Sequence, residues 1–112
     1  MSCDYMWDFS DNYQYMGKVR KGMPPLIITV ALTGGLHGKE ANPNLPESPE
    51  EQVEQTYECY KAGASIVHVH AKRADNRSLV SSNPNDYRLI SSMIRAKCPD
   101  IFSIIPPEAD RE

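Results

Sequence analysis

After residue 25 the chain alternates between apolar segments with strand character and segments with helical spacing. Residues 26–33 are almost continuously apolar and β-branched, which is typical of a parallel strand buried on both faces. Shorter apolar runs near residues 64–71 and at residues 101–105 predict two more strands. Amphipathic helical patterns separate these runs, so the expected order is strand, helix, strand, helix, strand.

The first expected helix begins at Ser48. Pro49 suits its first turn, and Glu51, three residues after the serine, completes the pattern of a capping box. Gly63 provides a stop at the C-terminal end. The stripe expected to enter the core comprises Val53, Tyr57 and Tyr60.

The second expected helix follows a polar loop at residues 72–82. Asn83 is the expected N-cap, Pro84 occupies the first turn, and Asp86 follows three residues after the cap. The expected buried face comprises Tyr87, Leu89, Ile90, Met93 and Ile94.

This alternation predicts an α/β fold built from two successive βαβ units. Such units require a parallel sheet with right-handed crossovers. No Gly-x-Gly-x-x-Gly motif follows the first strand, which argues against a dinucleotide fold. Three buried-type strands would leave unpaired edges, so further strands or another chain should cover them. A (β/α)8 barrel needs about 250 residues, of which this chain would supply only the first portion.

Residues 1–24 form a separate N-terminal arm that carries most of the aromatic side chains. This arm is too apolar for a solvated tail, so it should pack over another surface. Two arrangements stay open: the arm covers the base of its own domain, or it is exchanged with a neighbouring subunit. Its large apolar residues are Tyr5, Trp7, Phe9, Tyr13, Tyr15 and Met16.

Composition and charge limit the classes of function. The chain has 112 residues and a formal charge of −3, and no basic block suggests nucleic acid as a partner. Its three cysteines form no Cys-x-x-Cys pair, which favours a reducing compartment. The apolar run at residues 26–32 is far shorter than the roughly 20 residues that span a bilayer. We therefore expect a cytoplasmic protein without a membrane partner.

The candidate chemistry lies in the second strand. Side chains two residues apart share one face of a strand, so His68 and His70 should point together while Val67 and Val69 face the opposite way. Two imidazoles at this spacing can hold one metal ion, with ligand distances of about 2.0–2.1 Å for zinc. The alternative is a pair of core histidines whose nitrogens are satisfied by backbone groups.

Other polar residues give weaker signals. His37 lies in a loop beside two glycines and is expected to be solvated. Lys72 and Arg73 follow the histidine strand; they could meet the phosphates of a cofactor, but a solvated loop face is the simpler interpretation. Asp75 and Asp86 have no partner that spacing identifies.

Several of these stretches together resemble the opening of the β-keto acid cleavage enzymes. The resemblance implies an α/β fold consisting of the first βαβαβ units of a TIM (β/α)8 barrel, over residues 25–112, in a homo-oligomer. The stretches that carry the resemblance are Pro25-Leu-Ile-Ile-Thr-Val-Ala, Thr33-Gly-Gly, Asn42-Pro-Asn-Leu-Pro46, Ser48-Pro-Glu-Glu51 and Ala62-Gly-Ala-Ser-Ile-Val-His-Val-His70. The last of these stretches is the most specific.

The same resemblance implies a site and a reaction. His68 and His70 would bind a divalent metal, generally zinc, with a glutamate from a late barrel strand. The reaction would join a β-keto acid and acetyl-CoA, and release acetoacetate and a new acyl-CoA. The catalytic acid and base would also come from later strands. Substrate contacts are expected from the loop after the first strand, at Thr33, Gly34, Gly35 and Leu36.

Three departures from the family pattern matter. Leu36 stands where the family enzyme for an amino-substituted keto acid has a glutamate, so we expect a keto acid without an amino group. Pro106-Pro107-Glu108 replaces a Ser/Thr-Gly-Gly loop. The sequence ends at Glu112, before the late glutamate, which predicts a truncated chain that is not catalytic alone.

Two alternatives stay open. Metal-dependent hydrolases of the amidohydrolase kind also carry His-x-His on a barrel strand, typically the first, whereas here a strand and a helix precede it. A non-catalytic fragment that persists by associating with itself or another barrel piece would retain the motif without using it.

Overall fold

The computed structural model describes residues 10–22 and 26–105. The order of elements after the arm is strand, helix, strand, helix, strand, which confirms the predicted α/β alternation. Each strand is shorter than its apolar run. The elements are α1 (Asn12–Lys21), β1 (Thr29–Ala31), α2 (Pro49–Lys61), β2 (Ile66–His68), α3 (Pro84–Lys97) and β3 (Phe102–Ile104).

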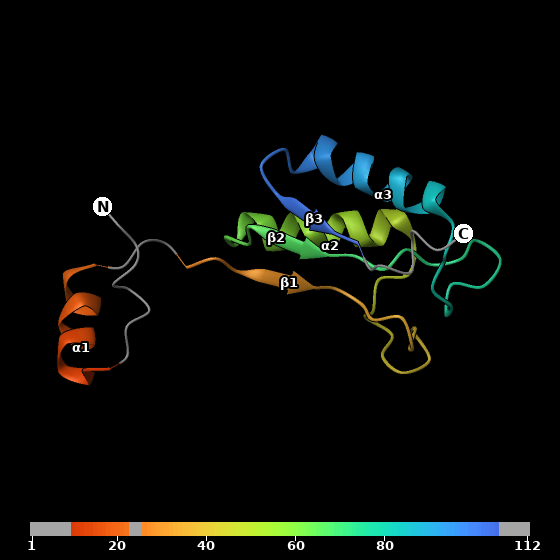
Figure 1. The fold of residues 1–112 in the computed structure, drawn as a ribbon. Helices are drawn as coiled ribbons and strands as arrows, with labels where there is room; N and C mark the ends of the chain where they lie inside the picture. The colour runs from red at the N-terminus through yellow and green to blue at the C-terminus, as the bar shows by residue number, and fades with distance from the viewer. Residues whose placement is uncertain (1–9, 23–25, 106–112) are drawn as a thin grey trace.

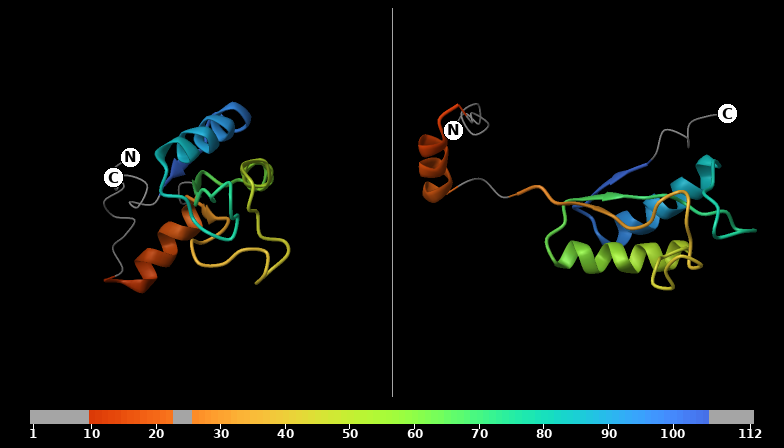
Figure 2. Two further views of the ribbon diagram at one scale, coloured as in Figure 1. Left: turned by 90° about the vertical axis from the view of Figure 1, so that its right-hand side faces the viewer. Right: turned by 90° about the horizontal axis from the view of Figure 1, so that it is seen from below.

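The three strands form one parallel sheet in the order β1-β2-β3. Figures 1 and 2 show α2 and α3 side by side on the same side of this sheet. Sequential strand order with both crossover helices on one face is found in the opening units of a barrel and also in one half of a doubly wound sheet. The three strands themselves do not close into a barrel.

The helix-covered face of the sheet holds the hydrophobic core. Val67 and Val69 of the central strand are buried there, as predicted. The register pairs Val30 and Ser103 with Val67, so these three side chains share that face. The buried residues that complete the core are Val53, Ala71, Tyr87, Ile90, Ile94, Cys98 and Ile101.

The predicted helix caps are confirmed. The Ser48 hydroxyl accepts a hydrogen bond from the Glu51 amide, and the Glu51 carboxylate accepts one from the Ser48 amide, both at 3.1 Å. The second helix is capped by the side chain of Asn83. Gly63 follows α2 with φ +110°, a conformation that disfavours any side chain.

The predicted buried faces need two corrections. In α2 the fully buried positions besides Val53 are polar, Gln52 and Thr56, whereas Tyr57 and Tyr60 are only partly buried. Polar residues are tolerated there because both side chains donate to backbone oxygens. In α3 the side chain of Leu89 is exposed, since the helix rests on Tyr87, Ile90 and Ile94.

The prediction that residues 26–33 are buried on both faces is wrong for the first part of the run. Leu26 and Ile27 are 81% and 71% exposed, and Phe102 of β3 is 74% exposed. Leu26 and Ile27 precede β1, and within the described residues little of the chain packs against these three side chains.

The arm contains a helix that the sequence pattern did not predict. Asp11 caps α1 by accepting hydrogen bonds from the amides of Tyr13 and Gln14. This helix buries no residue, and Figure 1 shows it apart from the sheet and its helices. Tyr5, Trp7 and Phe9 of the predicted arm lie outside the described residues, as does the 106–108 segment.

Candidate metal and substrate site

His68 and His70 lie on the same face of the central strand, as the alternation predicted. Their ring centroids are 4.9 Å apart and the ring planes differ by 12°, so the imidazoles are stacked. Both histidine side chains are half-buried. Val67 and Val69 are buried on the opposite face, toward the helices. A backbone hydrogen bond of 3.0 Å from Val69 to Ile104 continues the sheet beside the pair.

One nitrogen of this pair is buried without a partner. His68 Nε2 is enclosed and accepts or donates no hydrogen bond within the described part of the chain. A buried polar atom normally has a partner, because losing solvation without compensation costs about 1–3 kcal/mol. This nitrogen therefore lacks the backbone partner that the alternative of a satisfied core histidine would supply. A ring nitrogen left open in this way fits a metal ligand.

Two imidazoles are a partial donor set. Within residues 10–22 and 26–105, no group of three or more histidine, cysteine, aspartate or glutamate side chains could hold a metal ion. Neutral imidazoles suit zinc and similar divalent cations, which take three protein ligands in catalytic sites. The residues present thus fit part of such a site.

Gln52 stabilises the backbone of the histidine strand through a hydrogen bond. Its side chain is fully buried, and its amide nitrogen donates to the His70 carbonyl oxygen at 3.1 Å. The Thr56 hydroxyl in turn donates to the Gln52 carbonyl oxygen at 2.7 Å. The helix α2 therefore fixes the strand at the position of the second imidazole. Helical periodicity of apolar residues could not reveal this role, since both residues are polar.

The loop after β1 reaches the histidine pair. A Cβ added at Gly35 would lie 3.7 Å from His70 Nδ1 and 3.8 Å from the side chain of Val80. Thr33 is buried, and Leu36 is 89% exposed. Of the four predicted substrate residues, Gly35 is therefore beside a predicted metal ligand, and Leu36 stands at the surface of the same loop.

The interpretation of Lys72 as part of a solvated loop is wrong. Lys72 is 2% exposed, and its ammonium donates to the carbonyl oxygens of Gly34 at 2.8 Å and His37 at 3.2 Å. Burial lowers the pKa of this ammonium, while the charges of Glu47 and Glu40 act in the opposite direction. The available signal was the spacing, because residue 72 continues the two-residue period of His68 and His70.

The remaining polar candidates are outside the pair. His37 is exposed, as predicted. Arg73 and Asp75, whose partners spacing did not identify, form an exposed ion pair at 2.5 Å. Asp86 accepts a hydrogen bond from the Ser81 hydroxyl at 2.5 Å.

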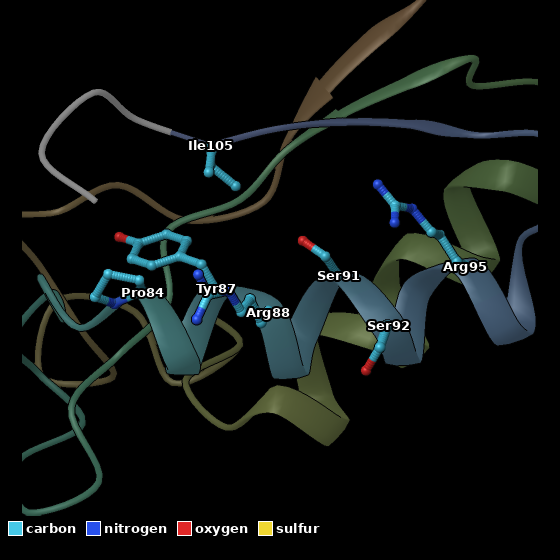
Figure 3. A pocket seen from close by; sticks show the side chains of 7 residues that line it. All are labelled: Pro84, Tyr87, Arg88, Ser91, Ser92, Arg95 and Ile105. Atoms are coloured by element: carbon cyan, nitrogen blue, oxygen red, sulfur yellow. The ribbon is translucent and has the colours of Figure 1, made fainter. Parts of the chain in front are cut away.

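A groove along α3 is separate from the histidines. Figure 3 shows it between α3 and Ile105, with Arg88, Ser91 and Arg95 on the helix side. None of the residues that line it is a histidine or belongs to the loop after β1. It lies beside the open edge of β3, where the next crossover of a continued sheet would pack. We therefore do not assign substrate to it.

Comparison with known families decides the class of this chain. The family model described as beta-keto acid cleavage enzyme matches residues 25–106. The chain belongs to the β-keto acid cleavage enzyme family. The resemblance in the sequence motifs is thereby confirmed. The matched range includes both histidines and the loop after β1.

Individual relatives carry related activities in their names. The chain is 39% identical over 79 residues to a 3-oxoadipate:acetyl-CoA acetyltransferase from Cupriavidus necator, covering 70% of this chain and 27% of the relative. It is 40% identical over 80 residues to a 3-keto-5-aminohexanoate cleavage enzyme from Fusobacterium nucleatum, covering 71% and 29%. It is 29% identical over 79 residues to a 3,5-dioxohexanoate:acetyl-CoA acetone transferase from Paraburkholderia graminis, covering 70% and 25%.

The chain therefore spans between 25% and 29% of the length of these three relatives. Within the described residues, no helix is long and apolar enough to cross a membrane.

Proposed function

We propose that this chain supplies the metal-binding strand and the first substrate loop of a metal-dependent β-keto acid cleavage enzyme. The reaction converts a β-keto acid and acetyl-CoA into acetoacetate and a new acyl-CoA. Family membership and the names of the relatives support the reaction class. The observation that carries the proposal for this chain is the stacked pair His68 and His70, with one buried nitrogen left open.

In this proposal His68 and His70 hold a divalent cation, Zn²⁺ by preference. When bound, such a cation supplies Lewis acidity, which polarises a keto carbonyl and eases the loss of a proton from the adjacent carbon. The chain's own contribution is to present neutral imidazoles in a fixed orientation. Gln52 assists by holding the His70 carbonyl, which keeps the strand from shifting relative to α2.

Thr33, Gly34, Gly35 and Leu36 contact the keto acid in this proposal. Gly35 leaves room next to His70, where a side chain would come into contact with the imidazole. Leu36 offers an apolar surface and no charge, so it cannot neutralise an ammonium group on the substrate. The favoured substrate is a β-keto acid without an amino group.

The rest of the site lies on elements other than those described. We propose that the three strands are the first of a TIM barrel, and that a later strand contributes a carboxylate ligand and the acid–base residues. The uncovered face of the sheet and its open edges support this, because later strands and subunits would cover them. The chain alone, residues 1–112, is then not catalytic, and complete enzymes form homo-oligomers.

Titration with zinc tests the metal proposal in this chain. We expect His68→Ala and His70→Ala each to weaken zinc binding by about tenfold or more, because one imidazole cannot chelate. His37→Ala is the matched control: it removes the exposed third histidine and should change the affinity less than about twofold. Equal affinity in His68→Ala and in the unmodified chain would refute the metal pair.

An acyl-CoA assay tests the statement about activity. The purified chain, given zinc, acetyl-CoA and a β-keto acid, should show no turnover above the reaction without protein. Turnover that disappears in His70→Ala would show that the chain is a complete enzyme and would overturn this part of the proposal.

A further inference from the structure

We propose that Lys72 is a positioning residue that holds the loop after β1 against the histidine strand, and so sets the place of Leu36 in the substrate site. Its ammonium reaches from the segment that follows β2 to two carbonyl oxygens of that loop, Gly34 at 2.8 Å and His37 at 3.2 Å. These two oxygens flank Gly35 and Leu36 in sequence. One cation thus fixes both ends of the segment predicted to meet substrate.

The backbone that carries Lys72 is itself anchored. Lys72 forms an isolated antiparallel bridge with Val80. On either side of it, the Ser81 amide donates to the Ala71 carbonyl at 2.7 Å and the Arg73 amide donates to the Leu79 carbonyl at 2.9 Å. The ammonium therefore projects from a segment whose backbone is held on both sides by hydrogen bonds, as a residue that positions a loop requires.

The far end of the loop is closed by two carboxylates. The Gly38 amide donates to Glu40 at 2.7 Å, and the Lys39 amide donates to Glu47 at 2.6 Å. Their charges also compensate the buried ammonium of Lys72. An apolar side chain at residue 72 would leave the two carbonyl oxygens without this donor, and the loop would lose its tie to the hairpin.

Hydrogen exchange of the 112-residue chain, followed by mass spectrometry, tests this inference. Lys72→Met should speed exchange of the Gly38 and Lys39 amides by about tenfold or more, with the amides of β2 changed less than about twofold. Lys72→Arg, which keeps a buried cation with several donors, should restore most of the protection. Arg73→Met is the matched control, since its exposed side chain pairs with Asp75 and should leave the loop unchanged.

A second measurement avoids any variant that fails to fold. In the unmodified chain an amine-acetylating reagent should modify Lys72 at least about tenfold more slowly than Lys61, whose side chain is 48% exposed. Equal rates at the two lysines would overturn the inference, as would unchanged exchange of the loop in a folded Lys72→Met chain.

The role of Leu36 rests on the proposed function, and the design separates the two. His68→Ala should weaken zinc binding by about tenfold or more while leaving loop exchange unchanged. Lys72→Met should alter loop exchange while changing zinc affinity less than about threefold. Failure of zinc binding in the unmodified chain would count against the metal site, and the exchange result would still decide the role of Lys72.

Discussion

The two faces of the sheet differ in how fully the described residues cover them. The face toward α2 and α3 is a closed core in which Val67, Ile90 and Ile94 are almost fully buried. The opposite face carries His68 between Ala31 and Ile104 in the register, and within the described residues no helix or strand covers it. The first face is a packed core, and the second carries the two proposed metal ligands. The described residues therefore explain how these units fold more completely than they explain the proposed chemistry.

The strongest test of this contrast compares one substitution on each face. Ile94→Ala should lower the free energy of unfolding by about 2–5 kcal/mol, because it opens a cavity in the closed core. Ile104→Ala, at a 44% exposed position, should cost less than about 1 kcal/mol. Urea unfolding followed by circular dichroism measures both. Equal losses would mean that the open face is covered in solution.

A smaller effect is expected at the N-terminus of α2. Hydrogen bonds from the Lys39 side chain and from the Glu47 and Ser48 amides lower the pKa of Glu51 from 4.5 to about 2. Because the folded pKa is depressed, this stabilisation is present above pH 4.5 and is lost as pH falls toward 2. The side chain is 42% exposed, so solvent screens the pair, and we expect about 1 kcal/mol.

Glu51→Gln should therefore lower the free energy of unfolding at pH 6 and flatten its decline between pH 5 and pH 2. Glu50→Gln, at the exposed neighbouring position, is the matched control. Because the core between the sheet and its two helices is closed, we expect the Glu51→Gln variant to stay folded at neutral pH. An acid profile identical to that of the unmodified chain would show that this capping box does not contribute to acid stability.

The smallest change in stability is expected at the open face. Phe102→Lys, at a 74% exposed position, should alter the free energy of unfolding by less than about 0.5 kcal/mol. We expect it to reduce self-association of the chain, since uncovered apolar strands promote pairing between copies. Light scattering after size-exclusion chromatography, over a range of concentrations, measures this. A monomer at every concentration, in both chains, would contradict self-association through this face.

Local chemistry made most of the fold predictable. The capping box at Ser48 and Glu51 and the stop at Gly63 located α2, because these signals depend on neighbouring residues alone. The exposure of Leu26 could not be judged in this way, since it depends on which other segments pack against it in the folded chain. The same limit applies to α1, whose aromatic residues suggested a covered surface but not a helix.

The candidate site was predictable in part for the same reason. The shared face of His68 and His70 follows from the period of a strand, and the stacked rings agree with it. The functions of Gln52 and Lys72 depend on contacts with carbonyl oxygens 18 and 35–38 residues away in sequence. No local pattern contains that information, so burial of these polar side chains became visible only in the folded chain.

The hydrogen bond from Gln52 to the His70 carbonyl has one wider consequence. The imidazole pair, the helix that steadies it and the lysine that holds the adjoining loop all lie between residues 33 and 72. Neighbours outside this stretch also orient the two rings, because β1 and β3 flank the histidine strand and Val80 pairs with Lys72. A graft of the pair onto another parallel sheet would therefore have to reproduce these neighbours as well, and the third ligand could then be chosen from the host.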